Sequence, residues 1–499
     1  MAATRIAIPQ RSAAKINRRV LIGVPEDSPS IGYGPERMGG LANYRPRLER
    51  TLAERADAYA VPGAVVGVLL GDEIEVATYG IANLATGVEV TPDTLFQIGS
   101  IAKIYTATLL CQMEGAGVVS LDEPVRAQLQ EFAVADPGAT LEITPRHLLA
   151  HTSGMHGDHL IDTGWNPDAL ERYVETLHAL GQIHAPEETY SFCNTGFGVA
   201  GRLIEVATGE NFDRVLRRRL VHPIGARATL TLPQHALVHR VAVGHELPQG
   251  GQPARAVHRW PLARANGPMG GILAPADEVL SFARLHVAGG IALNGAELLP
   301  AHTVEAMAEP QVESPLPDED QALAWTVRRW GGVTCLGQDG DTFGQRSYLR
   351  VIPQRRFAAV VLANSPAGAP LANDLWPSIV GDLADVEVPP LSTDLGPQGT
   401  LDDAAPFVGS FDRLHQRIDV TAATDTTEKA LDMRVTPSGV LDELGREGAV
   451  IRLVPVNLDA GIFRASWPES GLDEPVVFTP PTDGRAQAVY LQGRLHTRT

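Results

Sequence analysis

Residues 94–125 read "TLFQIGSIAKIYTATLLCQMEGAGVVSLDEPV". The run from 101 to 115 is mostly apolar, which predicts a helix, and the following "SLDEPV" predicts a helix stop and a turn. Ser100 and Lys103 are three residues apart at the start of this run. Because residues i and i+3 share a helix face, we expect the two side chains to lie side by side near the helix N-terminus.

The use of lysine supports a special role for this position. The chain has only three lysines, Lys15, Lys103 and Lys429, among 41 lysines and arginines. A serine hydroxyl needs a base to become a nucleophile, and a lysine amine is a base only when burial or nearby positive charge keeps it neutral. Arginine keeps its proton, so position 103 is expected to need an amine. The alternative, which a bare S-x-x-K pattern favours, is a helix-edge lysine with Ser100 as N-cap.

The composition is that of an ordinary globular protein, with 499 residues, 44% hydrophobic and 20% charged residues, and a formal net charge of −18. The acidic balance argues against partners such as nucleic acid or an anionic membrane surface. No apolar run is long enough to span a bilayer. Three scattered cysteines and a basic N-terminus without a signal-peptide core predict a cytoplasmic location.

Strand patterns occur near both ends of residues 43–387, and mostly helical patterns lie between them. The sequence therefore predicts an α+β domain, with an antiparallel sheet covered by helices and a helical lobe. The expected elements are a helix over 44–60, a hairpin that turns at Gly71-Asp72, a second hairpin over 346–365 and a helix over 370–386.

The two ends of the chain differ from this domain. Residues 1–42 are rich in Gly, Pro and Arg, and we expect a flexible arm. Residues 388–404 have the composition of a linker. Short alternating strands at regular spacing fill 405–499, which predicts a small all-β barrel or sandwich.

Four ordered blocks resemble the serine β-lactamase and penicillin-binding-protein superfamily, in its class C β-lactamase-like branch of esterases, D-aminopeptidases and acyltransferases. The blocks are residues 94–125, "ITPRHLLAHTSGM" (143–155), "NTGFGVAGRLIEVATG" (194–209) and "GPMGGILAPADEVLSFARL" (267–285). The resemblance covers roughly 45–387 and implies the fold expected above. It also implies that Ser100 is acylated with the assistance of Lys103. A lipocalin-like barrel after the serine domain resembles the layout of penicillin-binding-protein-type thioesterases that cyclise peptides.

The family's second motif, Tyr-x-Asn, aligns with Phe192-Cys193-Asn194, so the phenol that shuttles a proton is missing. Asn194 is expected to bond Lys103 and a substrate amide. Tyr190, two residues upstream, faces the same side in an extended segment and could substitute through a shifted loop; the alternative is a packed tyrosine. Cys193 is interpreted as a small packing residue.

The third motif, Lys-Thr-Gly or His-x-Gly, aligns with Gln338-Asp339-Gly340. Gln338 can donate and accept hydrogen bonds but is no base. Gly340 keeps the close backbone approach, and the resemblance implies an oxyanion hole from the N–H groups of Ser100 and Asp341. The Asp341 carboxylate either suits an amine-bearing substrate or is a solvated turn residue, and the sequence leaves both open.

The remaining candidates are weaker. The stretch "HGDHLID" (156–162) contains His156, Asp158, His159 and Asp162, but its spacing matches no common zinc site, and a polar loop over the active-site mouth is the favoured interpretation. We expect no metal and no cofactor. "HTSG" (151–154) is interpreted as a structural block.

The leading hypothesis is a serine acyl-transfer enzyme, whether hydrolase, transacylase or peptide cyclase. It forms an acyl-enzyme at Ser100 on an amide, ester or thioester of a small peptide or natural product. A carrier protein or other acyl donor is a further expected partner. The alternative is a repurposed relative that uses the pocket for non-hydrolytic chemistry or ligand binding, because Phe192 and Gln338 replace the titratable family residues.

Overall fold

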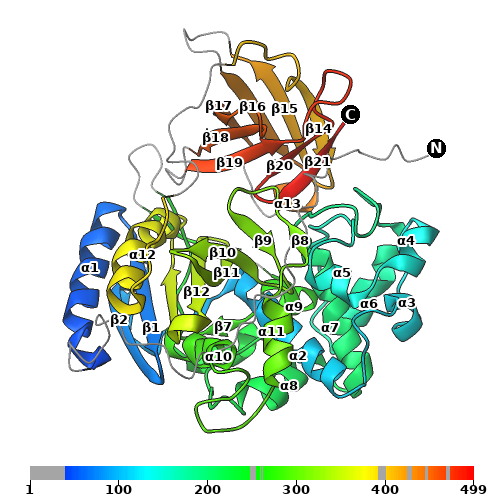
Figure 1. Ribbon diagram of the computed structural model, residues 1–499. Coiled ribbons are helices and arrows are strands. Elements are labelled where there is room, and N and C mark those ends of the chain that lie inside the picture. Colours follow the sequence, from blue (N-terminus) through cyan, green and yellow to red (C-terminus); the bar gives the residue numbers. More distant parts are fainter. Residues whose placement is uncertain are drawn as a thin grey trace.

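The computed structural model describes residues 40–247, 254–258, 260, 262–390, 401–423, 430–443, 448–467 and 473–499. Most of the expected arm (1–42) and residues 391–400 of the expected linker lie outside these described residues. Helices and strands form two parts, an α/β part from residue 41 onward and a barrel after residue 408 (Figure 1). No helix in the described part of the chain is long and apolar enough to cross a bilayer.

The first part contains, among the described residues, a nine-stranded antiparallel sheet in the order β3-β2-β1-β13-β12-β11-β10-β9-β8. Strands from its two ends pair at the centre, where Val66 of β1 lies opposite Val361 of β13. The strands are β1 (Gly63–Leu70), β2 (Glu73–Asn83), β3 (Val88–Glu89), β8 (Val312–Glu313), β9 (Glu319–Gln321), β10 (Thr326–Trp330), β11 (Val333–Thr342), β12 (Gln345–Ile352) and β13 (Phe357–Ala363).

Both hairpins expected from the sequence form. Strands β1 and β2 turn at Gly71-Asp72, where Gly71 has a φ of +64°, a conformation that glycine adopts without steric cost. Strands β12 and β13 are joined by a short 3-10 turn over Pro353–Arg355. The antiparallel, helix-covered sheet predicted for this domain is therefore confirmed.

Helices cover both faces of the sheet. Helices α1 and α12 pack on one face, where Leu48 and Leu375 share a buried apolar cluster with Val66. Helix α10 and the helical lobe cover the other face, where Leu280 joins a cluster with Val65 and Val360. The helices are α1 (Arg45–Ala58), α2 (Ala102–Gly115), α3 (Val125–Gln128), α4 (Pro137–Glu142), α5 (Pro145–Leu149), α6 (Ala169–Thr176), α7 (Asn194–Thr208), α8 (Phe212–Leu216), α9 (Gly267–Gly270), α10 (Ala276–Val287), α11 (Ala301–Ala308) and α12 (Gly368–Ala384).

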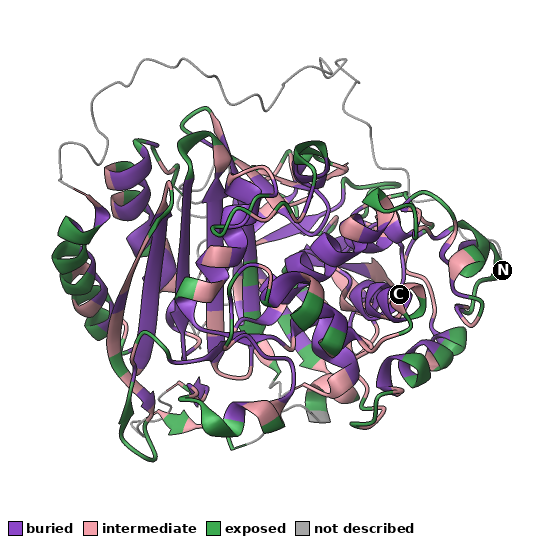
Figure 2. Cartoon of the chain, turned by 90° about the horizontal axis from the view of Figure 1, so that it is seen from below, coloured by how far each residue is buried: buried purple, intermediate pink, exposed green. Residues whose placement is uncertain are grey.

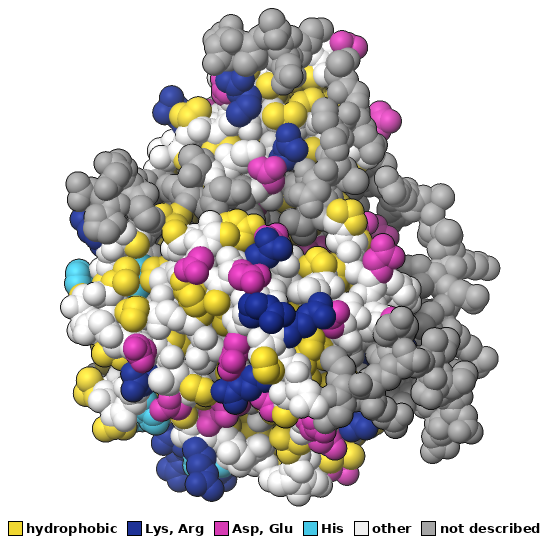
Figure 3. Space-filling view, turned by 90° about the vertical axis from the view of Figure 1, so that its left-hand side faces the viewer, with side chains coloured by type: hydrophobic (Ala, Val, Ile, Leu, Met, Phe, Trp, Pro, Cys, Tyr) yellow, Lys and Arg dark blue, Asp and Glu magenta, His cyan; other side chains and the backbone are white. Residues whose placement is uncertain are grey.

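Burial follows this layering. Figure 2 shows the sheet strands as largely buried and the outer surfaces of the covering helices as exposed. Basic and acidic side chains intermingle on the face seen in Figure 3. Arg45 and Glu49 form an exposed pair within α1, and Arg47 of α1 pairs with Asp382 of α12; such surface pairs contribute little to stability. Helix α2 is different, because it is apolar on nearly every side and is buried accordingly.

The second part is a closed barrel of eight antiparallel strands in chain order among the described residues. Its centre is aromatic, with Phe407, Phe411, Phe463 and Phe478 in edge-to-face contact. The predicted all-β barrel is confirmed. Its elements are β14 (Gly409–Arg413), β15 (Gln416–Ala422), β16 (Leu431–Pro437), α13 (Val440–Glu443), β17 (Ala449–Asn457), β18 (Ile462–Ser466), β19 (Asp473–Phe478), β20 (Ala488–Leu491) and β21 (Arg494–Arg498).

The last hairpin of the barrel docks on the serine domain. Tyr490 and Leu495 form an apolar cluster with Leu316, which precedes β9. The backbone N–H of Phe192 donates to Gly493 O (2.9 Å), and Leu495 N–H donates to Ser191 Oγ (3.3 Å). The turn between β20 and β21 is thereby fixed against the segment that leads into α7.

Candidate active site

Ser100 lies in a single 3-10 turn, Gly99–Ile101, that leads into α2. Lys103 is the second residue of α2, so its side chain reaches Ser100 on the same face. Its Nζ lies 2.8 Å from Ser100 Oγ and donates to Met269 O at 2.7 Å. The short antiparallel pair β4 (Phe96–Gln97) and β7 (Leu273–Ala274) brings the Met269 segment alongside. The structure thus brings together the two residues that the sequence singled out.

Lys103 is fully buried. Burial first, and the positive charge of Arg494 second, hold the pKa of Lys103 well below its ordinary value, while Asp158 opposes the shift. A neutral amine has a lone pair that can accept the Ser100 hydroxyl proton and an N–H that can donate to the Met269 carbonyl. The lowered pKa of Lys103 favours the neutral amine that a lysine base requires.

Phe192 occupies the position of the missing phenol. Its ring stacks on His151 at 4.5 Å between centroids, and Lys103 Nζ lies 4.9 Å from its centre. The Arg494 guanidinium carbon lies 4.6 Å from the same ring. An aromatic ring can stabilise a nearby cation but carries no exchangeable proton. Phe192 therefore places an apolar ring where the family has a phenol, and this ring contacts Arg494 of the barrel.

Asn194 is the first residue of α7, and its Nδ2 donates to Asp158 Oδ1 at 2.7 Å. The structure shows no hydrogen bond between Asn194 and Lys103, whose amine contacts Ser100 and Met269, and the expected contact of Asn194 with a substrate amide stays a prediction. The structure instead connects Asn194 to a buried carboxylate.

Asp158 joins the two domains. It is 2% exposed and forms ion pairs with Arg413 of β14 and with Arg494 of β21, the latter at 3.0 Å. Burial alone raises the pKa of Asp158, but the two guanidinium groups outweigh it and hold that pKa far below its ordinary value. Within the "HGDHLID" stretch, Asp158 therefore holds the barrel against the serine domain through its two ion pairs.

The other polar residues of that stretch have local partners. His156 Nδ1 accepts from Leu414 N at 3.3 Å, which adds a further contact with the barrel. His159 Nε2 lies 2.9 Å from Thr176 Oγ1. No group of three or more metal-ligating side chains occurs in the part of the chain that the structure describes.

Strand β11 approaches the serine through two glycines. A Cβ on Gly340 would lie 2.2 Å from Ile98 O, and a Cβ on Gly99, whose φ is +50°, would lie 2.8 Å from the Asp341 nitrogen. Ser347 Oγ donates to Ile98 O at 2.7 Å and fixes this approach. The Asp341 backbone is thereby brought against the turn that carries Ser100, as an oxyanion hole requires.

Gln338 and Asp339 are tied to the protein. The Gln338 Nε2 donates to Ala324 O at 2.8 Å, and its Oε1 accepts from the Asp339 N–H at 3.2 Å. Asp339 forms an ion pair with Arg350. Burial raises the pKa of Asp339, but the positive charges of Arg350 and Arg328 outweigh it and hold the pKa below its ordinary value. The Gln338 amide is therefore engaged within its own domain.

Asp341 and Tyr190 also have defined neighbours. The Asp341 carboxylate pairs with Arg346 across the β11–β12 hairpin and is exposed to solvent, so both interpretations of its side chain stay predictions. Tyr190 is buried, and its hydroxyl lies 3.2 Å from the position of a Cβ on Gly493. Tyr190 therefore packs against the docked turn of the barrel, and its catalytic role stays a prediction.

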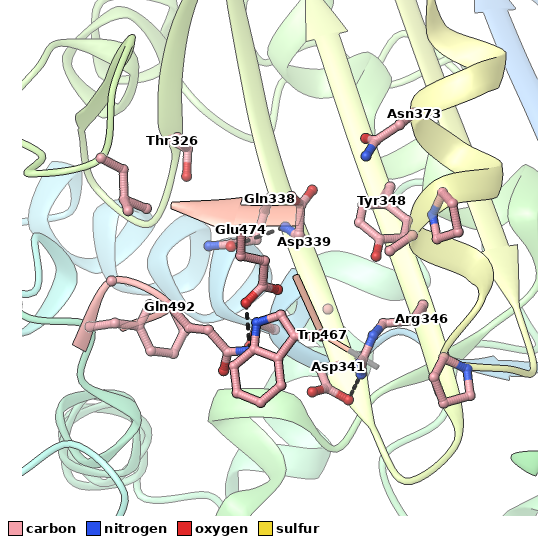
Figure 4. Close-up of a pocket in the computed structure, with 18 of the residues that line it drawn as sticks. Thr326, Gln338, Asp339, Asp341, Arg346, Tyr348, Asn373, Trp467, Glu474 and Gln492 are labelled. Atoms are coloured by element: carbon pink, nitrogen blue, oxygen red, sulfur yellow. Dashed lines mark hydrogen bonds and ion pairs between the residues drawn. The ribbon is translucent and has the colours of Figure 1, made fainter. Parts of the chain in front are cut away.

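These residues line one cleft of about 2050 Å³ between the serine domain and the barrel. One wall holds Ser100, Phe192, Gln338 and Asp341. The barrel supplies the other wall, and sequence reasoning missed its residues Arg413 and Arg494. It also missed Trp467, Glu474 and Gln492, which are labelled in Figure 4. Nothing in the local sequence marks them, because their importance depends on how the barrel docks.

The fold, the buried lysine at a serine and the glycine-lined strand beside them define a serine acyl-transfer enzyme, followed by a β-barrel. The chain belongs to the beta-lactamase family, whose family model matches residues 48–383. The predicted superfamily is thereby confirmed.

Individual relatives agree with this assignment. The chain is 38% identical to "Penicillin-binding protein 4" of Amycolatopsis lactamdurans over 370 residues, which are 72% of this chain and 96% of that protein. It is 28% identical to an unguisins hydrolase of Aspergillus campestris over 62% of this chain and 59% of that enzyme. The crystal structure of SurE matches with a TM-score of 0.72 and 26% identity over 92% of this chain and 100% of SurE, and that of SurE with D-Leu matches with 0.71 and 25% over the same shares.

Proposed function

We propose that the protein forms an acyl-enzyme at Ser100 and transfers the acyl group of a short peptide substrate to an amine. The observation that carries the proposal is the 2.8 Å contact between Ser100 Oγ and the buried Lys103 amine. Lys103 takes the hydroxyl proton as Oγ attacks the carbonyl carbon of an amide, ester or thioester, and delivers it to the leaving amine, alcohol or thiol as the bond between that group and the carbonyl carbon breaks. The backbone N–H groups of Ser100 and Asp341 hold the resulting oxyanion.

The surroundings support transfer over rapid hydrolysis. Phe192 has no proton to exchange, and the Gln338 amide is engaged with Ala324. Activation of a water molecule is therefore slow, whereas an amine is a better nucleophile than water and needs less assistance. A short peptide substrate is supported by the wide cleft and by the relatives, which include an unguisins hydrolase and SurE crystallised with D-Leu.

Intact-protein mass spectrometry tests the acyl-enzyme. A fluorophosphonate probe is expected to add one adduct to the wild type and none to Ser100→Ala, because Ser100 has the buried Lys103 amine beside it as a base. An unmodified wild type, or an equal adduct on Ser100→Ala, contradicts the proposal and favours a pocket used for binding alone.

A second variant tests the fate of the acyl group. Phe192→Tyr restores a phenol beside Lys103 and is expected to raise acyl-enzyme hydrolysis about tenfold, below the usual range for general acid–base catalysis because Gln338 stays engaged. The measurement is steady-state release of p-nitrophenolate from an ester, with Tyr173→Phe as a control that changes a tyrosine of the helical lobe. Unchanged hydrolysis in Phe192→Tyr contradicts the account of slow water attack.

A further inference from the structure

Glu474 is a carboxyl on the barrel wall of the cleft. It lies in β19 and lines the same cleft as Ser100. The Gln492 Nε2 donates to its Oε2 at 3.0 Å, and the indole of Trp467 lies beside it (Figure 4). Both neighbours are neutral. The barrel thus presents a hydrogen-bonded, half-buried carboxyl toward the serine domain.

A short chain of contacts connects Glu474 to the reacting residues. Its partner Gln492 precedes Gly493, whose carbonyl accepts the Phe192 N–H at 2.9 Å. The Phe192 ring lies 4.9 Å from Lys103 Nζ, which contacts Ser100. The turn whose Gln492 bonds Glu474 therefore also bonds Phe192, whose ring contacts Lys103.

Glu474 differs in charge balance from the neighbouring carboxyls. Three of these are paired with arginines: Asp158 with Arg413 and Arg494, Asp339 with Arg350, and Asp341 with Arg346. Glu474 forms no ion pair with any residue that the structure describes. Arg346 and Arg494 act on it only at longer range, and both already have a carboxylate partner.

We propose that the Glu474 carboxyl binds a primary ammonium group of the substrate, chiefly that of the amine that receives the acyl group from Ser100. This inference rests on the proposed function. A carboxylate without its own cation in a partly desolvated cleft gains strongly from a charge-assisted hydrogen bond with an ammonium group. Burial raises the pKa of Glu474, so the carboxyl is also suited to accept a proton from that ammonium.

In the transfer step, Glu474 and Lys103 each accept one proton from the attacking nitrogen. Glu474 takes one proton from the ammonium and passes it to solvent. The neutral nitrogen attacks the carbonyl carbon of the ester at Ser100, so that a C–N bond forms and the C–Oγ bond breaks. Lys103 takes the second nitrogen proton and delivers it to Ser100 Oγ, which regenerates the hydroxyl. The products are an amide and the unmodified enzyme.

Competition between two acceptors tests the assignment. The full chain is given the p-nitrophenyl ester of N-acetyl-D-leucine with benzylamine or with benzyl alcohol, and the products are separated by liquid chromatography and mass spectrometry. Glu474→Gln is expected to lower the ratio of benzylamide to free acid about tenfold or more. The p-nitrophenolate burst and the yield of benzyl ester are expected to stay within about twofold of wild type. Glu474→Asp should retain part of the amide yield.

Asp473→Asn is the matched control, because it removes the same charge from the adjacent residue of β19, whose partners are Ser466 and Arg464. It should behave as wild type. The ammonium group that Glu474 binds could also belong to the acyl donor, and the p-nitrophenyl ester of D-leucine, which has a free amine, tests this. If Glu474→Gln lowers product formation with this donor alone, Glu474 binds the ammonium group of the donor and not that of the acceptor.

Unchanged product ratios with both donors in Glu474→Gln overturn the inference while the acyl-enzyme stands. A wild type without a p-nitrophenolate burst overturns the proposed function itself, and the inference with it.

Discussion

The two walls of the cleft are built on different physical principles. The serine wall relies on exclusion of water, since Lys103 is fully buried, with a hydroxyl and a carbonyl as its hydrogen-bond partners. The barrel wall relies on balanced charge, since Arg413 and Arg494 meet across Asp158. The first arrangement lowers the pKa of an amine, and the second joins two domains. The serine–lysine pair of the family therefore lies in this protein beside a second wall that the barrel domain supplies.

The largest expected effect comes from removing the Asp158 carboxylate, which joins the barrel to the serine domain. Asp158→Ala leaves the buried Arg413 without a counter-ion and is expected to lower the free energy of unfolding by about 3–5 kcal/mol. Urea unfolding measures this. Asp122→Ala is the matched control, because the Asp122–Arg146 pair is at the surface and contributes at most about 1 kcal/mol. Equal destabilisation by the two variants contradicts the structural role of Asp158.

The next largest effect is expected from moving strand β11 away from the turn that carries Ser100. In Gly340→Ala the added Cβ would lie 2.2 Å from Ile98 O and 2.3 Å from Ser347 Oγ, so β11 has to move away from Ser100. Loss of an oxyanion donor typically lowers the rate by about 10²–10³. The measurement is kcat/KM for a p-nitrophenyl ester.

Gly115→Ala is the control, because a Cβ at Gly115 has open space around it, and this variant should keep full activity. If Gly115→Ala lowers kcat/KM as much as Gly340→Ala does, the close approach of Gly340 to Ile98 is not the cause of the lower rate.

The smallest expected effect comes from the positive charge of Arg494, which acts across the cleft on Lys103. Arg494→Gln removes a positive charge that lowers the pKa of Lys103, while Asp158, which raises it, remains along with Cys193. The pKa of Lys103 therefore rises, and the acidic limb of the acylation rate moves to higher pH. Stopped-flow pH profiles measure this. A limb that stays in place or moves to lower pH shows that Arg494 does not act on Lys103.

The local elements and the Ser100–Lys103 spacing could be predicted from the sequence because they depend on short-range patterns, and the resemblance to the superfamily supported their arrangement in one sheet. Alternating strands, the Gly71-Asp72 turn and the apolar run after Ser100 each determine local structure. The i, i+3 spacing and the rarity of lysine drew attention to Lys103, and the resemblance of the surrounding blocks to the superfamily made Ser100 the expected nucleophile.

The rest of the site depends on tertiary contacts. Asp158 bonds residues 255 and 336 positions away, and no local pattern encodes such pairs. The family alignment placed Asn194 beside Lys103, but the buried Asp158 is its partner in the structure. Glu474 and Gln492 look like ordinary strand and turn residues until the barrel is docked.

The most direct test of the account is the pH dependence of Ser100 acylation. We predict that the rate of fluorophosphonate modification rises with pH and reaches its plateau well below the ordinary lysine pKa of 10.5, because the buried Lys103 is neutral there. Lys103→Arg, which cannot supply a neutral amine, should be modified at least about 10³-fold more slowly. A limb at the ordinary lysine pKa, or equal rates in Lys103→Arg and wild type, would contradict the claim that a neutral Lys103 activates Ser100.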